Sequence, residues 1–547
     1  MDKLHKDTRF GYQLRAPKGW SQIPVKADEA WLLAKWMSDK TYFWTEKKGG
    51  WTWEHRPEVM VLGFVHAITQ APEEPEPDGK DGEDGEDGED GEDGGDGKDA
   101  DVVIRENPYR DYEDYLDRTY SGGGFYISSR KEKKHKGVEV TQLEIKVEKL
   151  ATTGPKRIIT WIYHLEDADV AVHIEVLEDK YSKLRSAINS TLNSFKTIER
   201  TGDGLPTSAS TSSDWITIYE MEQGSPAERR EKRMEAVRQY RERVVETLPD
   251  DWTAKEYDRV FVLSHVDAKY AKKLATQANL VLDWLDENLH FVGPDEYVRS
   301  PTLRICKDFD EASSFSQGRR GGGSGWFLFS SGAEIVTHKD EDGMISWEAG
   351  LLNGQLFDHW FDDRDRDLHW ALPNWLSHGL REYVVNLRLK GRKLEFRPDY
   401  WDKDEVRELV REGRATHPRE LMSMTSSQFN GSGSWDRNRE SAALVHFFLS
   451  GAAKKNKRTK NTLPNFIRDL RGVITSIEKE REQGEDGETV HEAPETEEEE
   501  EAQFKARREA WKEKEKRILD ETFQRSFGGW SDKDWDAFAK VYFASID

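Results

Sequence analysis

Two acidic tracts carry the net charge of this chain and limit where it can fold. The 547 residues hold 82 Lys and Arg against 106 Asp and Glu, a formal charge of −24 at pH 7. Residues 73–101 contain 16 acids and 2 lysines, and residues 478–501 contain 13 acids and 2 bases, so the remainder is close to neutral. Because a charged, glycine-rich segment without large apolar side chains does not build a core, we expect a disordered insert at 73–101. Both tracts are expected as inserts within folded domains.

Charge and cysteine content exclude several classes of protein. A near-neutral remainder lacks the concentrated basic face of a nonspecific nucleic-acid binder, so no nucleic-acid partner is expected. The single cysteine, Cys306, excludes an intrachain disulfide and a multi-cysteine metal site, and its alternating neighbours predict a buried strand residue. No apolar run reaches the roughly 18–20 residues that span a bilayer, and the first residues lack an apolar signal region. The sequence as written predicts a soluble, cytoplasmic protein without a membrane partner, or an exported one if a leader was removed.

Residues 1–200 predict an α+β domain, an antiparallel sheet with a covering helix. Apolar residues alternate at Tyr12, Leu14 and Ala16, and residues 158–163 and 170–176 read as an antiparallel strand pair. Apolar residues then recur at helical spacing from Tyr181 to Phe195. A sheet covered by such a helix is an α+β arrangement.

The same domain contains a basic run and a family resemblance. Residues 130–136 are basic and lie between strands, which predicts a hairpin tip, with contact to RNA or an acidic partner as the alternative. The segment Ala16-Pro17-Lys18-Gly19-Trp20 after the first strand, with a closing helix that ends near Phe195, is similar to PsbP-like domains. The resemblance implies a fold that serves many binding roles, and no function by itself.

The rest of the chain divides at a Ser-, Thr- and Gly-rich linker, residues 201–214. Residues 215–415 predict an α/β region that alternates helices and strands and ends in two helices, around 347–360 and 374–389. Residues 416–547 predict a helical subdomain that is interrupted by the acidic insert 478–501.

Two short blocks carry the chemistry that can be read from this sequence. They are Ser346-Trp347-Glu348-Ala349-Gly350-Leu351 and Trp375-Leu376-Ser377-His378-Gly379-Leu380-Arg381-Glu382-Tyr383. The second block resembles the Trp-Leu-Ser-Glu-Gly-Leu-Ala-Glu-Tyr helix of gluzincin-type metallopeptidases of the peptidase MA clan. In that family an upstream His-Glu-x-x-His helix supplies two zinc ligands and a general base, and the Glu before the Gly of the second helix is the third ligand. The resemblance implies a gluzincin-like domain over residues 215–547.

The positions of this chain that correspond to the family's zinc site lack most of the metal ligands. Trp347 and Leu351 stand at the two histidine positions, and His378 stands at the third ligand position. Glu348 matches the general base, and Glu382 matches the second-helix acid. Because an indole N–H only donates and leucine has no lone pair, we expect no zinc, no other cofactor and no catalytic residue here. If the two helices superpose on the family, a triple variant with histidines at 347 and 351 and glutamate at 378 should gain zinc affinity.

Ordinary structural interpretations stand beside this one. Trp347, Leu351 and Trp375 are simply explained as core residues, and His378 as a packed or partly exposed histidine. A relocated metal site is an alternative, although the spacing of the histidines that would form it is irregular. Its candidate ligands are His338, His359, His369 and His378.

The leading functional hypothesis is a catalytically inactive metallopeptidase-like protein, a pseudopeptidase, that binds a peptide or protein partner in the remaining cleft. One alternative is a metallopeptidase with substitute metal ligands and Glu348 as the general base. The other is a structural or assembly protein whose acidic inserts act as spacers.

Overall fold

The computed structural model describes most of the chain and divides it into two compact units. The first unit is Met1–Trp215 with Glu246–Pro249, and the second is Ile216–Val245 with Asp250–Asp547. Whether 416–547 forms a subdomain of its own stays a prediction. Residues outside the description are 1–3, 27–28, 30, 47–51, 67–108, 121–123, 149–153, 202–215, 217–219, 222, 294–297, 317–324, 330–331, 340–344, 392, 398–399, 485–496 and 547.

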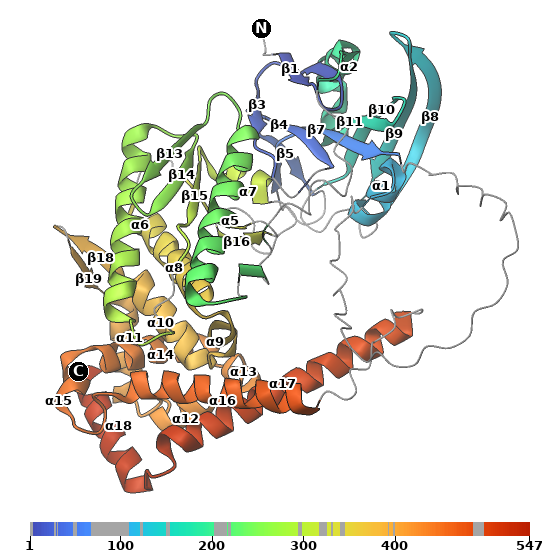
Figure 1. Ribbon diagram of the computed structural model, residues 1–547. Coiled ribbons are helices and arrows are strands. Elements are labelled where there is room, and N and C mark those ends of the chain that lie inside the picture. The colour runs from blue at the N-terminus through green and yellow to red at the C-terminus, as the bar shows by residue number, and fades with distance from the viewer. Residues whose placement is uncertain are drawn as a thin grey trace, which may run out of the picture. The chain divides into compact units, whose positions relative to one another are not determined.

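The first unit is built on a seven-stranded sheet in which every neighbouring pair is antiparallel (Figure 1). Its order is β3 (Trp20–Ile23), β4 (Leu32–Ser38), β7 (Glu58–Val65), β11 (Ala168–Leu177), β10 (Lys156–His164), β9 (Val138–Val147) and β8 (Phe125–His135). A three-stranded sheet, β1 (Leu4–Asp7), β2 (Tyr12–Arg15) and β12 (Lys196–Thr197), and the hairpin β5 (Tyr42–Thr45) with β6 (Thr52–His55) complete its strands.

Two helices of the first unit pack into separate apolar clusters, one on each face of the large sheet. Helix α2 (Tyr181–Ser194), preceded by the 3-10 turn Glu178–Lys180, joins the cluster that contains Val170, Val172 and Ile174. Helix α1 (Tyr112–Tyr120) joins the cluster that contains Leu143, Ile145 and Ala171. The α+β class with an antiparallel sheet and a covering helix is confirmed, and α1 is a second cover that the sequence interpretation missed.

The second unit begins as an α/β layer structure. Its five-stranded sheet runs β13 (Thr253–Tyr257), β14 (Val260–Ser264), β15 (Thr302–Cys306), β17 (Gly332–His338) and β16 (Gly325–Phe329). The central strands β14, β15 and β17 are parallel, and both edge strands are antiparallel to their neighbours. The associated helices are α5 (Pro226–Glu246), α6 (Ala268–Asn288), α7 (Phe309–Ser316) and α8 (Ile345–Arg364). Cys306 is buried at the end of β15, as predicted.

Helices dominate the remainder of the second unit (Figure 1). They are α9 (Arg366–Ala371), α10 (Asn374–Val385), α11 (Tyr400–Arg411), α12 (Pro418–Ser423), α13 (Ser426–Phe429), α14 (Ser434–Leu449), α15 (Gly451–Lys455), α16 (Thr462–Gly484), α17 (Glu497–Phe527) and α18 (Asp532–Ile546), with a hairpin of β18 (Leu387–Lys390) and β19 (Lys393–Phe396). One apolar core runs from the sheet through these helices, so its α/β and helical parts share a core. In the part of the chain described, no helix is long and apolar enough to cross a bilayer.

Two predicted boundaries differ from the structure. The helix predicted to reach residue 389 ends at Val385, because the backbone N–H and side-chain amide of Asn386 both bond the Glu382 carbonyl and close the last turn. The acidic tract 478–501 is helical at both described ends, since α16 continues to Gly484 and α17 begins at Glu497.

Candidate functional site

The two helices that carry the metallopeptidase-like blocks, α8 and α10, pack against each other in antiparallel directions. The Asn353 side-chain amide on α8 donates to the carbonyls of Val384 (3.3 Å) and Leu387 (3.1 Å). Five residues later, Asp358 accepts a hydrogen bond from Nε of Arg381 (3.1 Å). Between them, a Cβ on Gly354 would come within 3.1 Å of the Arg381 guanidinium carbon. These contacts fix which residues of the two helices face each other.

This register separates the residues that the sequence interpretation grouped. His378 lies one turn before Arg381, and Leu351 lies about two turns before Asp358. Because the helices are antiparallel, the two offsets add, and at about 1.5 Å of rise per residue they place Leu351 and His378 roughly 10–15 Å apart along the axes. The backbone of Trp347 and Glu348 lies in the first turn of α8, one turn further from His378 than Leu351 is. The structure does not describe the side chains of these two residues. Leu351 and His378 are therefore not brought together.

The groups beside His378 form an ion pair rather than a metal cluster. The His378 ring stacks on Phe429 with 5.4 Å between centroids. Burial lowers the pKa of His378 and Arg381 lowers it further, whereas Asp358 opposes them. Burial raises the pKa of Asp358, and Arg381 opposes that shift. The Arg381 guanidinium thus lies between α8 and α10.

The remaining predicted histidines have separate environments. His359 is buried and its Nε2–H donates to the Arg299 carbonyl (2.9 Å). His369 lies 3.5 Å from Asp362, and His338 meets the ring of Phe309 edge-on. Across the described ranges, no group of three or more His, Cys, Asp or Glu side chains is placed to hold a metal ion. Glu382 is partly buried on α10. The absence of a catalytic role for these residues stays a prediction.

The register changes the expected result of restoring the family's zinc ligands. The triple variant Trp347→His, Leu351→His and His378→Glu should fold and hold no stoichiometric zinc, because the glutamate at 378 lies too far from the two histidines of α8 to complete a three-ligand site. The matched design is Arg381→His, which removes the guanidinium and puts an imidazole beside Asp358 and one turn from His378. Elemental analysis after dialysis checks both, with circular dichroism as the folding control. Stoichiometric zinc in the triple variant would overturn the register.

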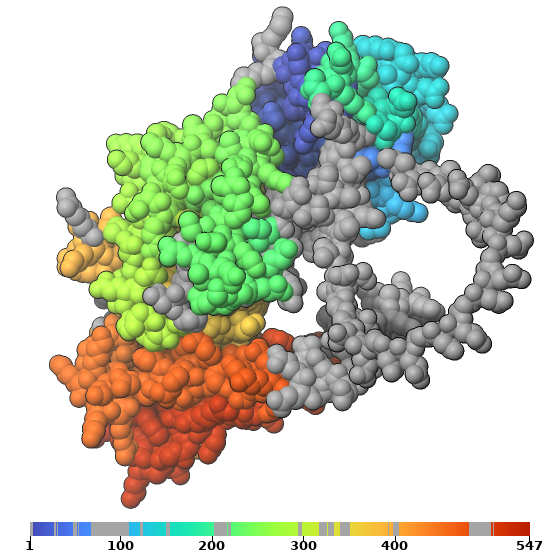
Figure 2. Space-filling model, viewed as in Figure 1, coloured from blue at the N-terminus to red at the C-terminus, as the bar shows by residue number. Residues whose placement is uncertain are grey.

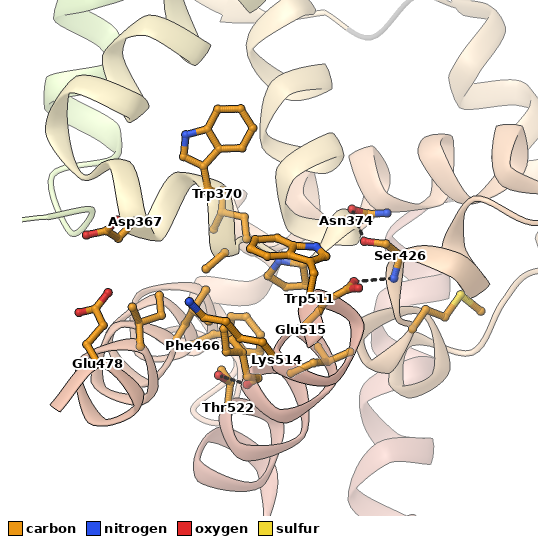
Figure 3. A pocket seen from close by; sticks show the side chains of 18 residues that line it. Asp367, Trp370, Asn374, Ser426, Phe466, Glu478, Trp511, Lys514, Glu515 and Thr522 are labelled. Atoms are coloured by element: carbon orange, nitrogen blue, oxygen red, sulfur yellow. Dashed lines mark hydrogen bonds between the residues drawn. The ribbon is translucent and has the colours of Figure 1, made fainter. Parts of the chain in front are cut away.

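A pocket of the second unit lies elsewhere, among α9, the start of α10, α13, α16 and α17. It encloses about 210 Å³. Its floor is apolar and comes from Phe466, Leu470 and Ile474 of α16 with Ile518 and Leu519 of α17, all of which are buried. Figure 3 shows Trp511 of α17 lying across the middle of this group. Its side chain is 54% exposed, unusually open for a tryptophan.

Polar contacts hold Trp511 in place over the pocket. Glu515, one turn after Trp511, accepts a hydrogen bond from the backbone N–H of Ser426 at the start of α13 (2.7 Å; Figure 3). The Ser426 hydroxyl in turn donates to the Asn374 side chain at the start of α10 (3.4 Å). These bonds tie α17 to α13 and α10 beside the pocket. The mouth is otherwise charged, with Asp367 and Glu478 at one end and Lys514 nearer Trp511 (Figure 3).

Sequence reasoning missed this pocket because its walls are far apart in the chain. Trp370 of α9 and Trp511 of α17 both line it, and 140 residues lie between them. Trp370 turns away from the centre in Figure 3, and its Nε1–H donates to Asp362 (3.1 Å). The one available signal was Trp511 itself, a tryptophan in a highly charged stretch of the predicted helical subdomain.

The fold and this pocket define the chain as a two-unit α+β protein with an open pocket the size of a side chain. No protein-family model matches the sequence, and no curated protein matches it. Solved structures are similar only at low identity. Cyanobacterial PsbP from Synechocystis sp. is 12% identical, with 36% of this chain and 91% of that chain covered and a TM-score of 0.23. LpqN of Mycobacterium tuberculosis, described as involved in cell envelope biogenesis, is 10% identical over 34% of this chain and 83% of its own, with a TM-score of 0.19. A Pseudomonas aeruginosa protein of unknown function, PA94, is 9% identical over 37% and 98%, with a TM-score of 0.17.

Proposed function

We propose that this chain is a catalytically inactive, metallopeptidase-like binding module that takes a peptide or protein segment at the pocket under Trp511. The observation that carries the proposal is an apolar, buried floor left open beneath an exposed indole. Sites of this kind receive the anchor residues of a partner, because a large apolar side chain gains most when it fills a preformed pocket.

The size of the pocket defines the kind of ligand. Cofactor and drug-sized sites enclose about 300–1,000 Å³, whereas this one encloses about 210 Å³. That volume suits a single leucine- or phenylalanine-sized side chain with its backbone lying outside. The charged mouth, with Asp367 and Glu478 at one end and Lys514 near Trp511, would contact the backbone and flanking polar groups of the segment.

Two features support a gluzincin-like origin for the second unit. A mixed sheet with an antiparallel edge strand leads directly into α8, and α8 then pairs with α10, which carries the family-like block. Where a peptidase needs an open cation site, the helix pair here holds the Asp358–Arg381 ion pair. A carboxylate already bonded to a guanidinium is a poor metal ligand, which favours binding over cleavage. We further propose that the first unit is PsbP-like, supported by its antiparallel sheet and closing helix.

Removal of the exposed indole tests the binding site. Pentapeptides with Phe, Leu or Ala at the centre of a glycine frame are the probes, and saturation-transfer NMR is the measurement. The Phe and Leu peptides should bind about tenfold or more tightly than the Ala peptide, since burial of such a side chain contributes about 1.5–3 kcal/mol. Trp511→Ala should weaken the Phe peptide about tenfold.

The matched control is Trp435→Ala. Trp435 is 68% exposed on α14 and does not line the pocket, so its loss should leave peptide binding unchanged. If both variants bind the Phe peptide as the unaltered chain does, the pocket is not the binding site.

A further inference from the structure

The sheet of the first unit ends in a long edge strand, whereas the pocket described above belongs to the second unit. Strand β8 spans 11 residues and is the last strand in the sheet order (Figure 1). Within the described residues its strand partner is β9, so the backbone groups on its other side face away from the sheet. The opposite edge strand, β3, has only 4 residues. Strand β8 is about as long as β9, which has 10 residues, so it leaves a long edge on its other side.

The outer half of β8 is regular and basic. A register shift interrupts the strand between Ile127 and Ser129, and pairing with β9 is then continuous from Ser129 to His135. This stretch reads Ser-Arg-Lys-Glu-Lys-Lys-His, with four basic residues against one acid. In Figure 2 the cyan atoms of this region lie at the surface of the first unit. The edge therefore offers about seven residues of regularly paired, positively charged strand.

Contacts at both ends and on both faces hold this edge in shape. Lys133 lies over the Trp161 ring, 3.9 Å from its centroid, and Arg130 pairs with Glu113 of α1 at 2.7 Å. After the turn, Lys136 Nζ donates to the Phe195 carbonyl at the end of α2 (2.8 Å). Lys131 and Lys134 remain exposed between these anchors. Such a preformed strand loses little freedom when another strand pairs with it.

We propose that the β8 edge binds an acidic, extended segment of a partner protein, which adds to the sheet as an eighth strand. Strand addition supplies main-chain hydrogen bonds without regard to sequence, and the side chains decide which strand is accepted. Like charges opposite one another destabilise a strand pair, so the lysines repel a second β8 edge. The same lysines attract a strand with Glu or Asp at alternate positions.

Peptide binding to the full chain tests this proposal. The probe is a fluorescein-labelled peptide of alternating Glu and Val, and fluorescence anisotropy is the measurement. A Lys-for-Glu peptide reverses the charge, and a peptide with the same Glu content but prolines in place of valines keeps the charge and removes backbone donors. Only the Glu/Val peptide should bind well, and the proline peptide should bind about tenfold or more weakly.

Charge reversal on the strand gives the matched protein variants. Lys131→Glu with Lys133→Glu should weaken the Glu/Val peptide about tenfold, because these two exposed lysines lie two residues apart on one face of β8 and two attractions become repulsions. Lys18→Glu with Lys40→Glu makes the same charge change at exposed positions of the same unit and should have no comparable effect. The proposal would be overturned if the proline peptide bound as tightly as the Glu/Val peptide, or if both double variants lost the same affinity. Binding of a single-stranded RNA oligonucleotide in place of the peptide would also overturn it. The Trp511→Ala variant should bind the Glu/Val peptide normally, which separates this site from the pocket.

Discussion

Replacement of Arg304 by methionine should lower the unfolding free energy of the second unit by about 3–5 kcal/mol. Arg304 on β15 and Glu334 on β17 are both fully buried. Nε and Nη2 of the arginine donate to the two carboxylate oxygens at 2.7 and 2.8 Å, and the Tyr240 hydroxyl of α5 donates to the same carboxylate. Loss of the arginine would leave a buried carboxylate without its cation, which costs far more than the pair contributes. Urea unfolding followed by circular dichroism measures the change.

The double variant separates the cost of an unpaired charge from the worth of the pair. Arg304→Met with Glu334→Leu removes both charges and should recover most of the stability, since a buried ion pair replaced by apolar groups is often neutral. The external control is Arg238→Met on α5, because Arg238 pairs with Glu242 at the surface and its loss should matter much less. This account would be contradicted if the double variant lost more unfolding free energy than Arg304→Met and Glu334→Leu lose together as single variants.

Acid should destabilise the first unit through two buried groups, His173 and Glu175. Beneath α1, the buried His173 ring accepts from the Tyr112 hydroxyl at Nδ1 (2.8 Å) and approaches the Tyr120 hydroxyl at Nε2 (3.3 Å). The pKa of His173 is lowered to about 4, chiefly by burial; Glu175 opposes this shift, and Lys156 and Lys35 add to it. Burial also acts to raise the pKa of Glu175, but Lys156, His55 and His173 bring it to about 2.

The lowered pKa values of His173 and Glu175 both make the first unit less stable as the pH falls. The unfolded chain takes up a proton on histidine near pH 6.5, and the folded unit resists it until about pH 4. The free energy of unfolding should therefore fall from pH 6.5 towards pH 4, by on the order of 3 kcal/mol for His173. Glu175 adds a further loss below about pH 4.5, since its folded pKa lies below the unfolded value.

Thermal melts between pH 7 and pH 4 check this expectation. In His173→Gln the decline between pH 6.5 and pH 4 should be much smaller, whereas His378→Gln, a change in the second unit, should leave the first unit's decline in place. The amide of glutamine keeps a donor and an acceptor for the two tyrosines, so the variant retains its hydrogen bonds. A slope that is equally steep in His173→Gln would show that another group controls acid unfolding.

Local patterns were enough to predict many elements of this fold. The apolar alternation of residues 170–176 and 158–163 corresponds to β11 and β10, which pair antiparallel as expected. The helical spacing from Tyr181 to Phe195 corresponds to α2. Helix α1 had the same kind of signal, because Tyr112, Tyr115, Leu116 and Tyr120 are spaced for one helix face and all are buried. It was missed because it is short and directly follows the acidic tract.

The candidate sites were much less predictable. The two metallopeptidase-like blocks are on the expected helices, but residue spacing could not give the register between α8 and α10. Asn353, Gly354 and Asp358 set that register through contacts across the helix pair. The pocket depends on α9 and α17, whose residues come together only after the helices between them have packed.

What the sequence by itself determined is therefore local: which segments are strands or helices, and which side chains have the chemistry to bind a metal. Those properties follow from the period of apolar residues and from the chemistry of single side chains. Only the tertiary structure decided that Leu351 and His378 lie apart and that Arg381 pairs with Asp358. It also decided that Trp511 lies over an apolar pocket. The reason is that contacts across packed helices depend on register and on long-range closure of the chain, which no local period records.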